Sequence, residues 1–320
     1  MSSRYPFPSS PNGWFSVAAS AELAIGDVRP ITFLERDFVL FRGEDGTARV
    51  FDAHCPHLGA HLGVGGRVCS DGIVCPFHGW QFAGSGQLVD VPGLDRVPRA
   101  EANSWPVCER NGRVFVWHHA DGIPPTYDVT NYRLDEDQWT PWKTNSYRVR
   151  VHVQDLTENI IDRAHFSVVH DMEPPETQHF EVRFDGVAMV VEQSLKVTAV
   201  DAAGFEIQTT STTCGPGIVA VEVSQDPIEM LTYITQTPVD EELTEVNLCF
   251  SMKKLPDEKA TATISELNDL TTNQQFAQDV AIWENKVYRQ RPIITRVDGP
   301  VAQYRRWFRQ FYPEDPSVSE

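Results

Sequence analysis

Two short segments of this 320-residue chain each place a cysteine and a histidine within one turn of backbone. The first reads Cys55-Pro-His57 and the second reads Cys75-Pro-Phe-His78. Thiolates and imidazoles are ligands of zinc and iron. Common zinc layouts pair Cys with Cys and His with His, whereas here each pair is mixed. The mixed pairs favour a two-iron cluster in which two thiolates hold one iron and two imidazoles hold the other. They therefore predict a one-electron relay, and a zinc knuckle is the alternative.

Two histidines further along the chain indicate a second metal site. His165 and His170 lie in a segment with apolar flanks, and two imidazoles with one carboxylate form the triad that binds Fe(II) and leaves positions open for oxygen. A step of five residues rotates by about 140° on an ideal helix. If both histidines are ligands, a helix must therefore end or bulge between them. Taken alone, the pair would favour ordinary core or surface histidines.

The third ligand requires a carboxylate, and Asp279 is the strongest candidate. It lies on the same helical stripe as Phe276, Ile282 and Trp283. A carboxylate on an apolar face is costly unless it is paired or binds a metal. We expect the three apolar residues to line a substrate pocket. The other acids of this region lack such apolar neighbours: they are Glu266, Asp269 and Glu284.

Composition sets the class of protein. The chain is long enough for two domains, and its 41% hydrophobic and 22% charged content is that of a globular protein. The sequence predicts neither a signal peptide nor a membrane span, because no apolar run approaches the required length. The four cysteines outside the paired motifs are scattered, which favours a reduced, cytoplasmic protein. A net charge of −18 argues against nucleic acid as a partner.

Charge is distributed unevenly along the chain. Residues 286–309 carry a cluster of basic residues against a single acid, Asp298. This segment could be a solvated face, or it could guide an acidic redox partner by electrostatic steering.

Local patterns divide the chain into two domains. The first 120 residues read as short strands between turns, for example 38–41, 50–53 and 114–117, without a helix of useful length. Breaker residues at 121–125 then mark a boundary. We therefore expect an all-β domain over residues 1–120 and a second domain over residues 121–320.

The second domain has the pattern of an α+β, helix-grip fold. We expect a strand at 146–153, a helical segment at 155–165 and a long terminal helix at 264–288. Residues 180–252 contain five or six strand-like runs, including 188–197, 205–212, 218–223 and 245–252. A broad antiparallel sheet gripped by a long helix would enclose a deep apolar pocket.

These residues carry a family resemblance. Residues 50–85 resemble the Rieske domain of Rieske non-haem iron oxygenases. The segment containing Asn159, Asp162, His165 and His170 is similar to the D-x-x-H-x-x-x-x-H segment of their large subunits, and Asp279 resembles their C-terminal carboxylate ligand. Residues 278–286, 299–300 and 304–312 look like the 3-ketosteroid 9α-hydroxylase oxygenases and the cholesterol 7-desaturases. The first motif departs from bacterial steroid hydroxylases by reading Cys-Pro-His in place of Cys-Arg-His.

The resemblance implies cofactors, partners and site residues. It implies a [2Fe-2S] Rieske cluster and a mononuclear Fe(II), with electrons from NAD(P)H through a ferredoxin and/or flavin reductase. The implied cluster ligands are Cys55, His57, Cys75 and His78, and the implied Fe(II) ligands are His165, His170 and Asp279. It also implies that Asp162, in the same segment as Asn159, carries electrons between protomers of a homotrimer.

The function implied is that of a terminal oxygenase in a multicomponent monooxygenase. Such an enzyme would use O2 to hydroxylate an unactivated C–H bond of a steroid-like or other polycyclic apolar substrate, held between the sheet and the helix that carries Trp283. Desaturation, oxidative demethylation and ring dihydroxylation are alternatives within the family. Outside it, the rivals are an electron carrier with a lipid-binding second domain and a zinc-stabilised binding module.

Overall fold

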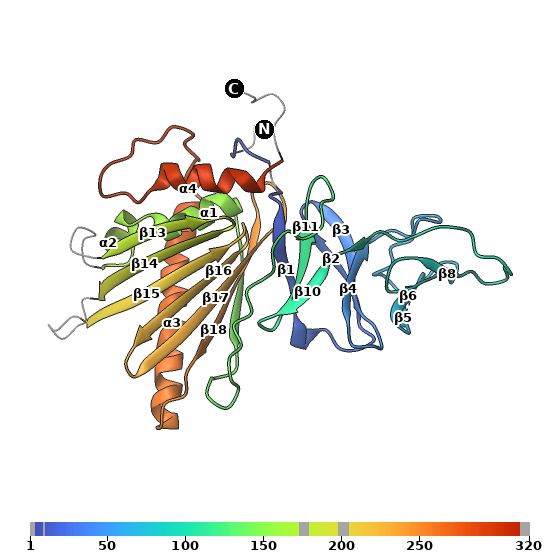
Figure 1. The fold of residues 1–320 in the computed structure, drawn as a ribbon, viewed down its shortest axis with the longest axis horizontal. Helices are drawn as coiled ribbons and strands as arrows, with labels where there is room; N and C mark the ends of the chain where they lie inside the picture. Colours follow the sequence, from blue (N-terminus) through green and yellow to red (C-terminus); the bar gives the residue numbers. More distant parts are fainter. Residues whose placement is uncertain (1–3, 9, 173–178, 198–204, 314–320) are drawn as a thin grey trace. The chain divides into compact units, whose positions relative to one another are not determined.

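The computed structural model describes residues 4–8, 10–172, 179–197 and 205–313, with the side chains of 195–197 and 205 excepted. The chain folds into two units. Gly13–Tyr132 forms one unit, and the chain from Arg133 onward forms the other together with Met1–Asn12. Figure 1 shows the strands and helices of each unit.

The first unit is built from three antiparallel sheets. One contains β1 (Gly13–Ala19), β11 (Arg113–His118) and β10 (Val107–Arg110). The second contains β2 (Val28–Phe33), β3 (Arg36–Arg42), β4 (Ala48–Asp52) and β9 (Ser104–Trp105). The third contains β5 (Arg67–Cys69), β6 (Gly72–Val74), β7 (Gln81–Phe82) and β8 (Leu88–Asp90). The single helical turn is η1 (Ser20–Glu22), so the expected all-β character of this region is confirmed.

The boundary between the units falls after Tyr132 and not after residue 120. Residues beyond 120 stay with the first unit because its indoles and amides bind them. Trp117 Nε1 donates to the carbonyl of Ile123 (2.7 Å), and Trp14 Nε1 donates to the carbonyl of Tyr127 (2.8 Å). The breaker residues at 121–125 therefore form a loop within the first unit.

The second unit contains a seven-stranded antiparallel sheet in the order β12-β18-β17-β16-β15-β14-β13. Its strands are β12 (Lys143–Val149), β13 (Phe180–Asp185), β14 (Ala188–Val197), β15 (Phe205–Cys214), β16 (Ile218–Gln225), β17 (Ile228–Pro238) and β18 (Thr244–Met252). Its helices are α1 (Val153–Glu158), η2 (Asn159–Ile161), α2 (Ala164–Val169), α3 (Glu258–Trp283), α4 (Val301–Phe308) and η4 (Arg309–Phe311). This sheet with its long helix confirms the α+β, helix-grip prediction.

The long helix packs on one face of the sheet. Phe276 and Trp283 of α3 join a buried cluster with Val246 and Leu248 of β18. The helix starts at Glu258, earlier than the expected residue 264, because the Asp257 side chain caps it by accepting the Lys259 N–H (2.9 Å). Periodicity of apolar residues could not reveal this first part, which is polar.

The N-terminal segment belongs to the second unit. The Arg4 guanidinium donates to the carbonyl oxygens of Trp283 (2.8 Å) and Lys286 (2.9 Å), just beyond α3. The Asn12 N–H donates to the carbonyl of Phe311 (2.6 Å). The start of the chain is thus tied to the end of α3 and to η4. In the described part of the chain, none of the helices is both long and apolar enough to cross a membrane.

Candidate metal centres

The two Cys/His segments of the first unit have the same backbone conformation. In each loop the cysteine N–H donates to the carbonyl five residues on, and the cysteine carbonyl accepts the N–H of the glycine four residues on. The first loop uses Cys55, Ala60 and Gly59, and the second uses Cys75, Trp80 and Gly79. Both glycines have positive φ, 74° and 72°, which glycine adopts without strain. The two loops therefore share these backbone hydrogen bonds, while the histidine follows the cysteine by two residues in the first loop and by three in the second.

The four side chains of these loops combine buried sulfur with more accessible imidazole. Cys55 and Cys75 are each 3% exposed and belong to one core cluster. The rings of His57 and His78 lie 4.6 Å apart between centroids. The His57 ring stacks on Trp80 at 4.2 Å, with an interplanar angle of 6°. His57 Nδ1 is buried, and no hydrogen-bond partner for it occurs among the described residues.

The pKa of the buried Cys55 thiol shows which protonation state it takes without a metal. Burial raises the pKa of the Cys55 thiol to about 11, against the backbone N–H of His57, and the neighbouring Cys75 raises it further. The Cys55 thiol would therefore stay protonated near pH 7 without a cation. A metal deprotonates coordinating thiols, and the unpartnered His57 Nδ1 is a ready ligand atom. The donor set of two sulfurs and two nitrogens fits a Rieske cluster.

The second unit brings His165, His170 and Asp279 together. One ligand atom from each lies within 4.8 Å of the others, and His170 Nε2 is 3.4 Å from Asp279 Oδ1. The helix α2 ends at Val169, and His170 follows it with φ −111° and ψ 10°. The helix thus ends between the two histidines, which is the break that their five-residue spacing requires. The side chains of His165, His170 and Asp279 are 10%, 4% and 12% exposed, so the three groups are largely shielded from water.

The Nδ1 atom of each imidazole lies beside an oxygen atom of the protein. His165 Nδ1 lies 2.6 Å from the carbonyl oxygen of Asp162, and His170 Nδ1 lies 3.0 Å from Gln278 Oε1. A carbonyl oxygen only accepts, so each Nδ1 carries a proton, which leaves Nε2 as the nitrogen of each ring that can bind a metal. This tautomer is the one that a metal at Nε2 requires. Gln278 was missed by sequence reasoning, and its position beside Asp279 was the only signal.

Asn159 and Asp162 lie at opposite ends of η2. Asn159 Nδ2 donates to Asp279 Oδ2 (3.2 Å) and is also 3.2 Å from His165 Nε2. The Asp162 carboxylate is 39% exposed, accepts the Ala164 N–H (3.1 Å) and comes within 4.0 Å of His165 Nδ1. Asn159 therefore contacts the cluster of His165, His170 and Asp279 directly. Asp162 contacts His165 of this cluster and is also partly exposed to solvent.

Burial and charge act differently on the two imidazoles. Burial lowers the pKa of His165, although the carboxylates of Asp162 and Asp279 oppose it. Burial also acts to lower the pKa of His170, but the hydrogen bonds with Asp279 and Gln278 outweigh it and raise that pKa. His165 is thus neutral near pH 7, as a metal ligand must be.

The predicted pocket residues of α3 divide into two groups. Phe276 (8% exposed) and Trp283 (4%) are buried with Asp279 (9%). Ile282 is 45% exposed, so it does not share the burial of the other two, and its place in the pocket stays a prediction. Adjacent residues differ by about 100° around a helix, which turns Ile282 away when Trp283 faces the sheet. The alternative acid Asp269 is paired with Lys143 (2.7 Å) on β12.

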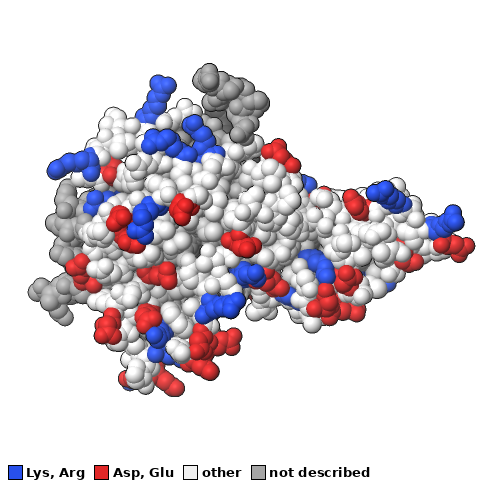
Figure 2. All heavy atoms as spheres, viewed as in Figure 1, with Lys and Arg blue, Asp and Glu red and all other residues white. Residues whose placement is uncertain are grey.

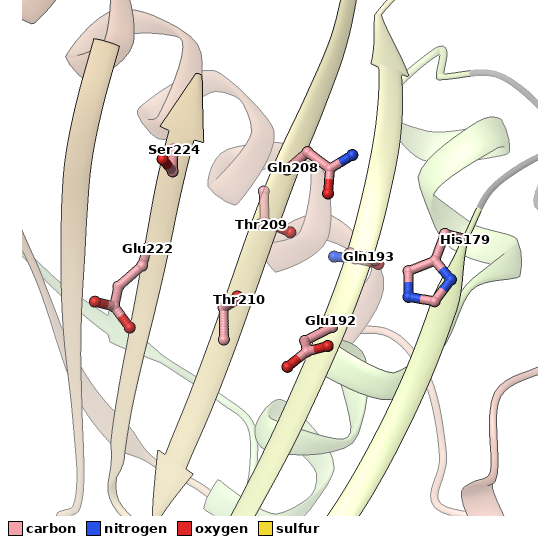
Figure 3. A pocket seen from close by; sticks show the side chains of 8 residues that line it. All are labelled: His179, Glu192, Gln193, Gln208, Thr209, Thr210, Glu222 and Ser224. Carbon is pink, nitrogen blue, oxygen red and sulfur yellow. The ribbon is translucent and has the colours of Figure 1, made fainter. Parts of the chain in front are cut away.

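A separate groove of about 320 Å³ lies over β13–β16 (Figure 3). It is lined by His179, Glu192, Gln193, Gln208, Thr209, Thr210, Glu222 and Ser224. His179, Glu181 and Glu192 also approach one another closely enough to hold a cation. Arg183 already pairs with Glu181 (3.4 Å) and Glu192 (2.7 Å), so its positive charge offsets part of the negative charge of this exposed cluster.

Family comparisons agree with this architecture. Residues 13–101 match the Rieske [2Fe-2S] domain, and residues 116–312 match the 3-ketosteroid 9α-hydroxylase C-terminal domain. An all-β cluster-binding unit followed by a helix-grip unit with two histidines and a carboxylate defines a Rieske-type non-haem iron monooxygenase, an O2-dependent oxidoreductase. The chain belongs to the Rieske oxygenases that carry a 3-ketosteroid 9α-hydroxylase C-terminal domain. Its cofactors are a Rieske [2Fe-2S] cluster and a mononuclear iron, with electrons supplied by a reductase.

Individual relatives cover nearly the whole chain. A cholesterol 7-desaturase of Xenopus laevis is 32% identical, over 95% of this chain and 72% of the relative. The oxygenase component of a 3-ketosteroid-9-alpha-monooxygenase of Rhodococcus rhodochrous is 31% identical, over 96% and 83%. Dicamba monooxygenase bound to dicamba has the same fold, with a TM-score of 0.72 at 18% identity, over 94% of this chain and 97% of that one.

Proposed function

We propose that this chain is the terminal oxygenase that hydroxylates an unactivated C–H bond of a steroid-like polycyclic substrate. The observation that carries the proposal is the convergence of His165, His170 and Asp279 in a unit that matches the 3-ketosteroid 9α-hydroxylase C-terminal domain. The relatives with the same two units are named for work on 3-ketosteroids and cholesterol. One relative is the oxygenase component of a monooxygenase that has further components. We therefore expect a ferredoxin or flavin reductase to deliver the electrons.

The residues of the chain have distinct roles in this proposal. Cys55, His57, Cys75 and His78 hold the Rieske cluster, and His165, His170 and Asp279 hold the mononuclear iron. When bound, the cluster would supply single electrons and the mononuclear iron would provide the site for dioxygen activation. The carbonyl of Asp162 and the side chain of Gln278 keep the two imidazoles in the ligating tautomer. Asn159 orients the Asp279 carboxylate through Oδ2.

The assembly that we propose is a cytoplasmic homotrimer. In a head-to-tail ring, the cluster of one protomer would face the mononuclear site of the next. Asp162 is suited to the bridge because its carboxylate is partly exposed while its carbonyl binds His165. The substrate would lie between the sheet and α3, beside Phe276 and Trp283.

Desaturation of the same class of substrate is the second candidate. The desaturase and hydroxylase relatives are almost equally similar, at 32% and 31% identity. Both reactions begin at a C–H bond of the substrate, so the pose of the substrate decides between them.

Turnover of a steroid panel tests the function. The purified holoprotein should contain about three irons per chain, two in the cluster and one at the triad. With a surrogate reductase and NADH, we expect at least one 3-ketosteroid or sterol to gain an oxygen atom, measured by mass spectrometry. Loss of two hydrogens without oxygen would favour the desaturase. About two irons per chain without turnover would instead indicate an electron carrier.

The Asp279→Ala variant tests the mononuclear site. Removing the carboxylate should empty that site and abolish turnover, while the visible spectrum of the Rieske cluster stays unchanged because it uses other residues. Glu266→Ala, at an exposed position of the same helix, is the matched control and should keep both metals. Full activity of Asp279→Ala, or loss of both metals together, would contradict the assignment.

A further inference from the structure

Trp80 connects the two Cys/His loops of the first unit. Its backbone carbonyl accepts the Cys75 N–H (2.8 Å), which closes the second loop. Its indole lies flat on the His57 ring of the first loop, with the ring centroids 4.2 Å apart and an interplanar angle of 6°. The same side chain packs against the core cluster that contains Cys55 and Cys75. Trp80 therefore belongs to one loop by its backbone and covers a candidate ligand of the other.

The two candidate imidazole ligands differ in what covers them. The His57 ring is partly buried, and its Nδ1 atom is buried without a hydrogen-bond partner among the described residues. His78 is exposed. The rings beside His78 are those of His57, at an interplanar angle of 66°, and of Phe77, at 41°. Phe77 is itself 61% exposed. His57 thus has a stacked apolar cover that His78 lacks.

The stack leaves the metal-binding atom of His57 free. The indole contacts the face of the imidazole, whereas a ring nitrogen binds a metal in the plane of the ring. Trp80 can therefore cover His57 without competing with a metal ion at Nδ1. Face-to-face contact on one side also restricts how the imidazole can turn, so the stack holds the orientation of the ring.

Charge determines how such a cover acts on a Rieske cluster. With two ferric ions, two sulfides, two thiolates and two neutral imidazoles, the oxidised cluster is neutral overall, and reduction by one electron gives it one negative charge. Water stabilises that charge better than an apolar side chain does. The face of an aromatic ring is moreover the negative side of its quadrupole. Both effects of the indole oppose reduction, so both lower the reduction potential.

We propose that Trp80 tunes the Rieske cluster through His57, lowering the reduction potential and so making the cluster a stronger electron donor to the mononuclear site. The inference rests on the proposed function, which makes His57 a ligand of the cluster. Solvent access and apolar surroundings are established controls of the potential of metal sites. Because Trp80 acts through His57, it is a positioning residue and not a ligand.

The reduction potential of Trp80 variants tests the proposal. It is measured on the purified holoprotein at pH 7, without reductase or substrate, by redox titration followed by visible circular dichroism. Trp80→Ala should shift the equilibrium toward the reduced form by about twofold to tenfold, the scale of one aromatic contact. A tenfold shift is about 59 mV for one electron. Trp80→Phe keeps a ring over His57 and should stay close to the unaltered protein.

A second substitution keeps the test decisive if Trp80→Ala does not hold a cluster. Trp80→Leu retains much of the apolar volume but has no aromatic face. It is then measured in place of the alanine variant, and its potential should lie above that of Trp80→Phe. Equal potentials in the leucine and phenylalanine variants would overturn the proposal.

Phe77→Ala is the matched control. Phe77 lies beside the other imidazole, with its ring centroid 3.8 Å from that of His78, but most of its side chain is already in water. Its removal should leave the potential close to that of the unaltered protein. An equal rise in Phe77→Ala and Trp80→Ala would show that any loss of bulk beside the cluster raises the potential, and would overturn the proposal. An intact cluster in Trp80→Ala with an unchanged or lower potential would also overturn it.

The outcomes separate this inference from the proposed function. If the holoprotein turns over a steroid-like substrate but the Trp80 variants keep its potential, the inference fails alone. If the potential rises in Trp80→Ala but no such substrate is turned over, the inference holds and the proposed substrate class fails. A protein without a Rieske spectrum would contradict both.

Discussion

Each imidazole of the mononuclear cluster has its Nδ1 proton held by an oxygen of the protein, and one of these oxygens belongs to a side chain that can be removed. Gln278→Ala deletes the acceptor of His170 while leaving all three ligand atoms in place. Loss of such a supporting hydrogen bond typically weakens metal binding roughly tenfold to a hundredfold. We expect that loss in an iron titration of the metal-depleted protein, followed by iron analysis.

Gln274→Ala is the control for this prediction, because Gln274 is exposed on the same helix. Its iron affinity should be that of the unaltered protein. Equal affinity in Gln278→Ala would mean that Gln278 does not orient His170. The visible spectrum of the Rieske cluster should be the same in both variants.

Ligand type sets the potential of the Rieske cluster. In His57→Cys a thiolate replaces a neutral imidazole, and the added negative charge should lower the reduction potential. Electrochemical titration of the variant would measure the change. An intact cluster with the parent's potential would show that His57 is not a ligand.

At the residue scale, the sequence could predict the ligand candidates but not the residues that support them. The mixed Cys/His spacing and the carboxylate on an apolar stripe can be recognised from the sequence alone. Gln278 and the carbonyl of Asp162 gain their roles only when the chain brings them to the second ring nitrogens. Ile282 was placed on the same stripe as Phe276 and Trp283 but is 45% exposed, because an approximate stripe does not define how the helix is rotated against its sheet.

Among the elements, η2 depends on close contact with a distant loop. A Cβ built on Gly299 would lie 1.5 Å from the carbonyl oxygen of Ile161. That carbonyl lies between Asn159 and Asp162, both of which contact His165. The loop before α4 thus sets the position of η2, and only glycine allows this approach.

Gly299→Ala should therefore displace η2 and disturb the mononuclear cluster. Overpacking of this kind typically costs about 1–3 kcal/mol of unfolding free energy. We expect lower mononuclear iron content and a lower unfolding midpoint, with an unchanged Rieske spectrum as the internal control. Normal iron content at normal stability would show that the loop and η2 can separate without consequence.

Element types were more predictable than element ends. Alternating residues identified the strands of the second unit, and an apolar stripe identified the long helix. The end of α2 between His165 and His170 was inferred from ligand geometry and not from any breaker residue. The start of α3 at Glu258 and the loop at 121–132 depend on capping and on indole hydrogen bonds across the fold, which local patterns do not report.

Some of the basic residues of segment 286–309 form ion pairs within the folded chain. Arg305 binds Glu158 through two hydrogen bonds (2.6 and 2.7 Å), and Lys286 pairs with the buried Asp155 (3.0 Å). These two residues of the basic segment therefore stabilise α1 and are not free for a partner. Arg289, Arg291, Arg306 and Arg309 remain exposed, and Figure 2 shows basic side chains gathered around α4.

Mixed assemblies test the proposed trimer. One inactive protein lacks the cluster ligand His78, and the other lacks the triad ligand His165, both replaced by Ala. If electrons pass between protomers, co-expression of the two should restore part of the activity, measured as steroid turnover per mixed trimer. Differently tagged chains, purified through both tags, ensure that the assemblies are mixed. No recovery in such assemblies, or full activity of an isolated monomer, would contradict the ring.

The assignment of Met1–Asn12 to the second unit gives the chain an insertion topology. The cluster-binding unit has both its entry, at Asn12 and Gly13, and its exit, at Tyr132 and Arg133, joined to the same body. A protease that cuts only the exit leaves a fragment whose first residues still hold Trp283, Lys286 and Phe311 by hydrogen bonds. The nicked protein should then behave as a two-chain molecule, and release of the cluster-binding unit requires a second cut. For the same reason, a gene encoding the second unit alone must rejoin residues 1–12 to residue 133 to retain its own N-terminal segment.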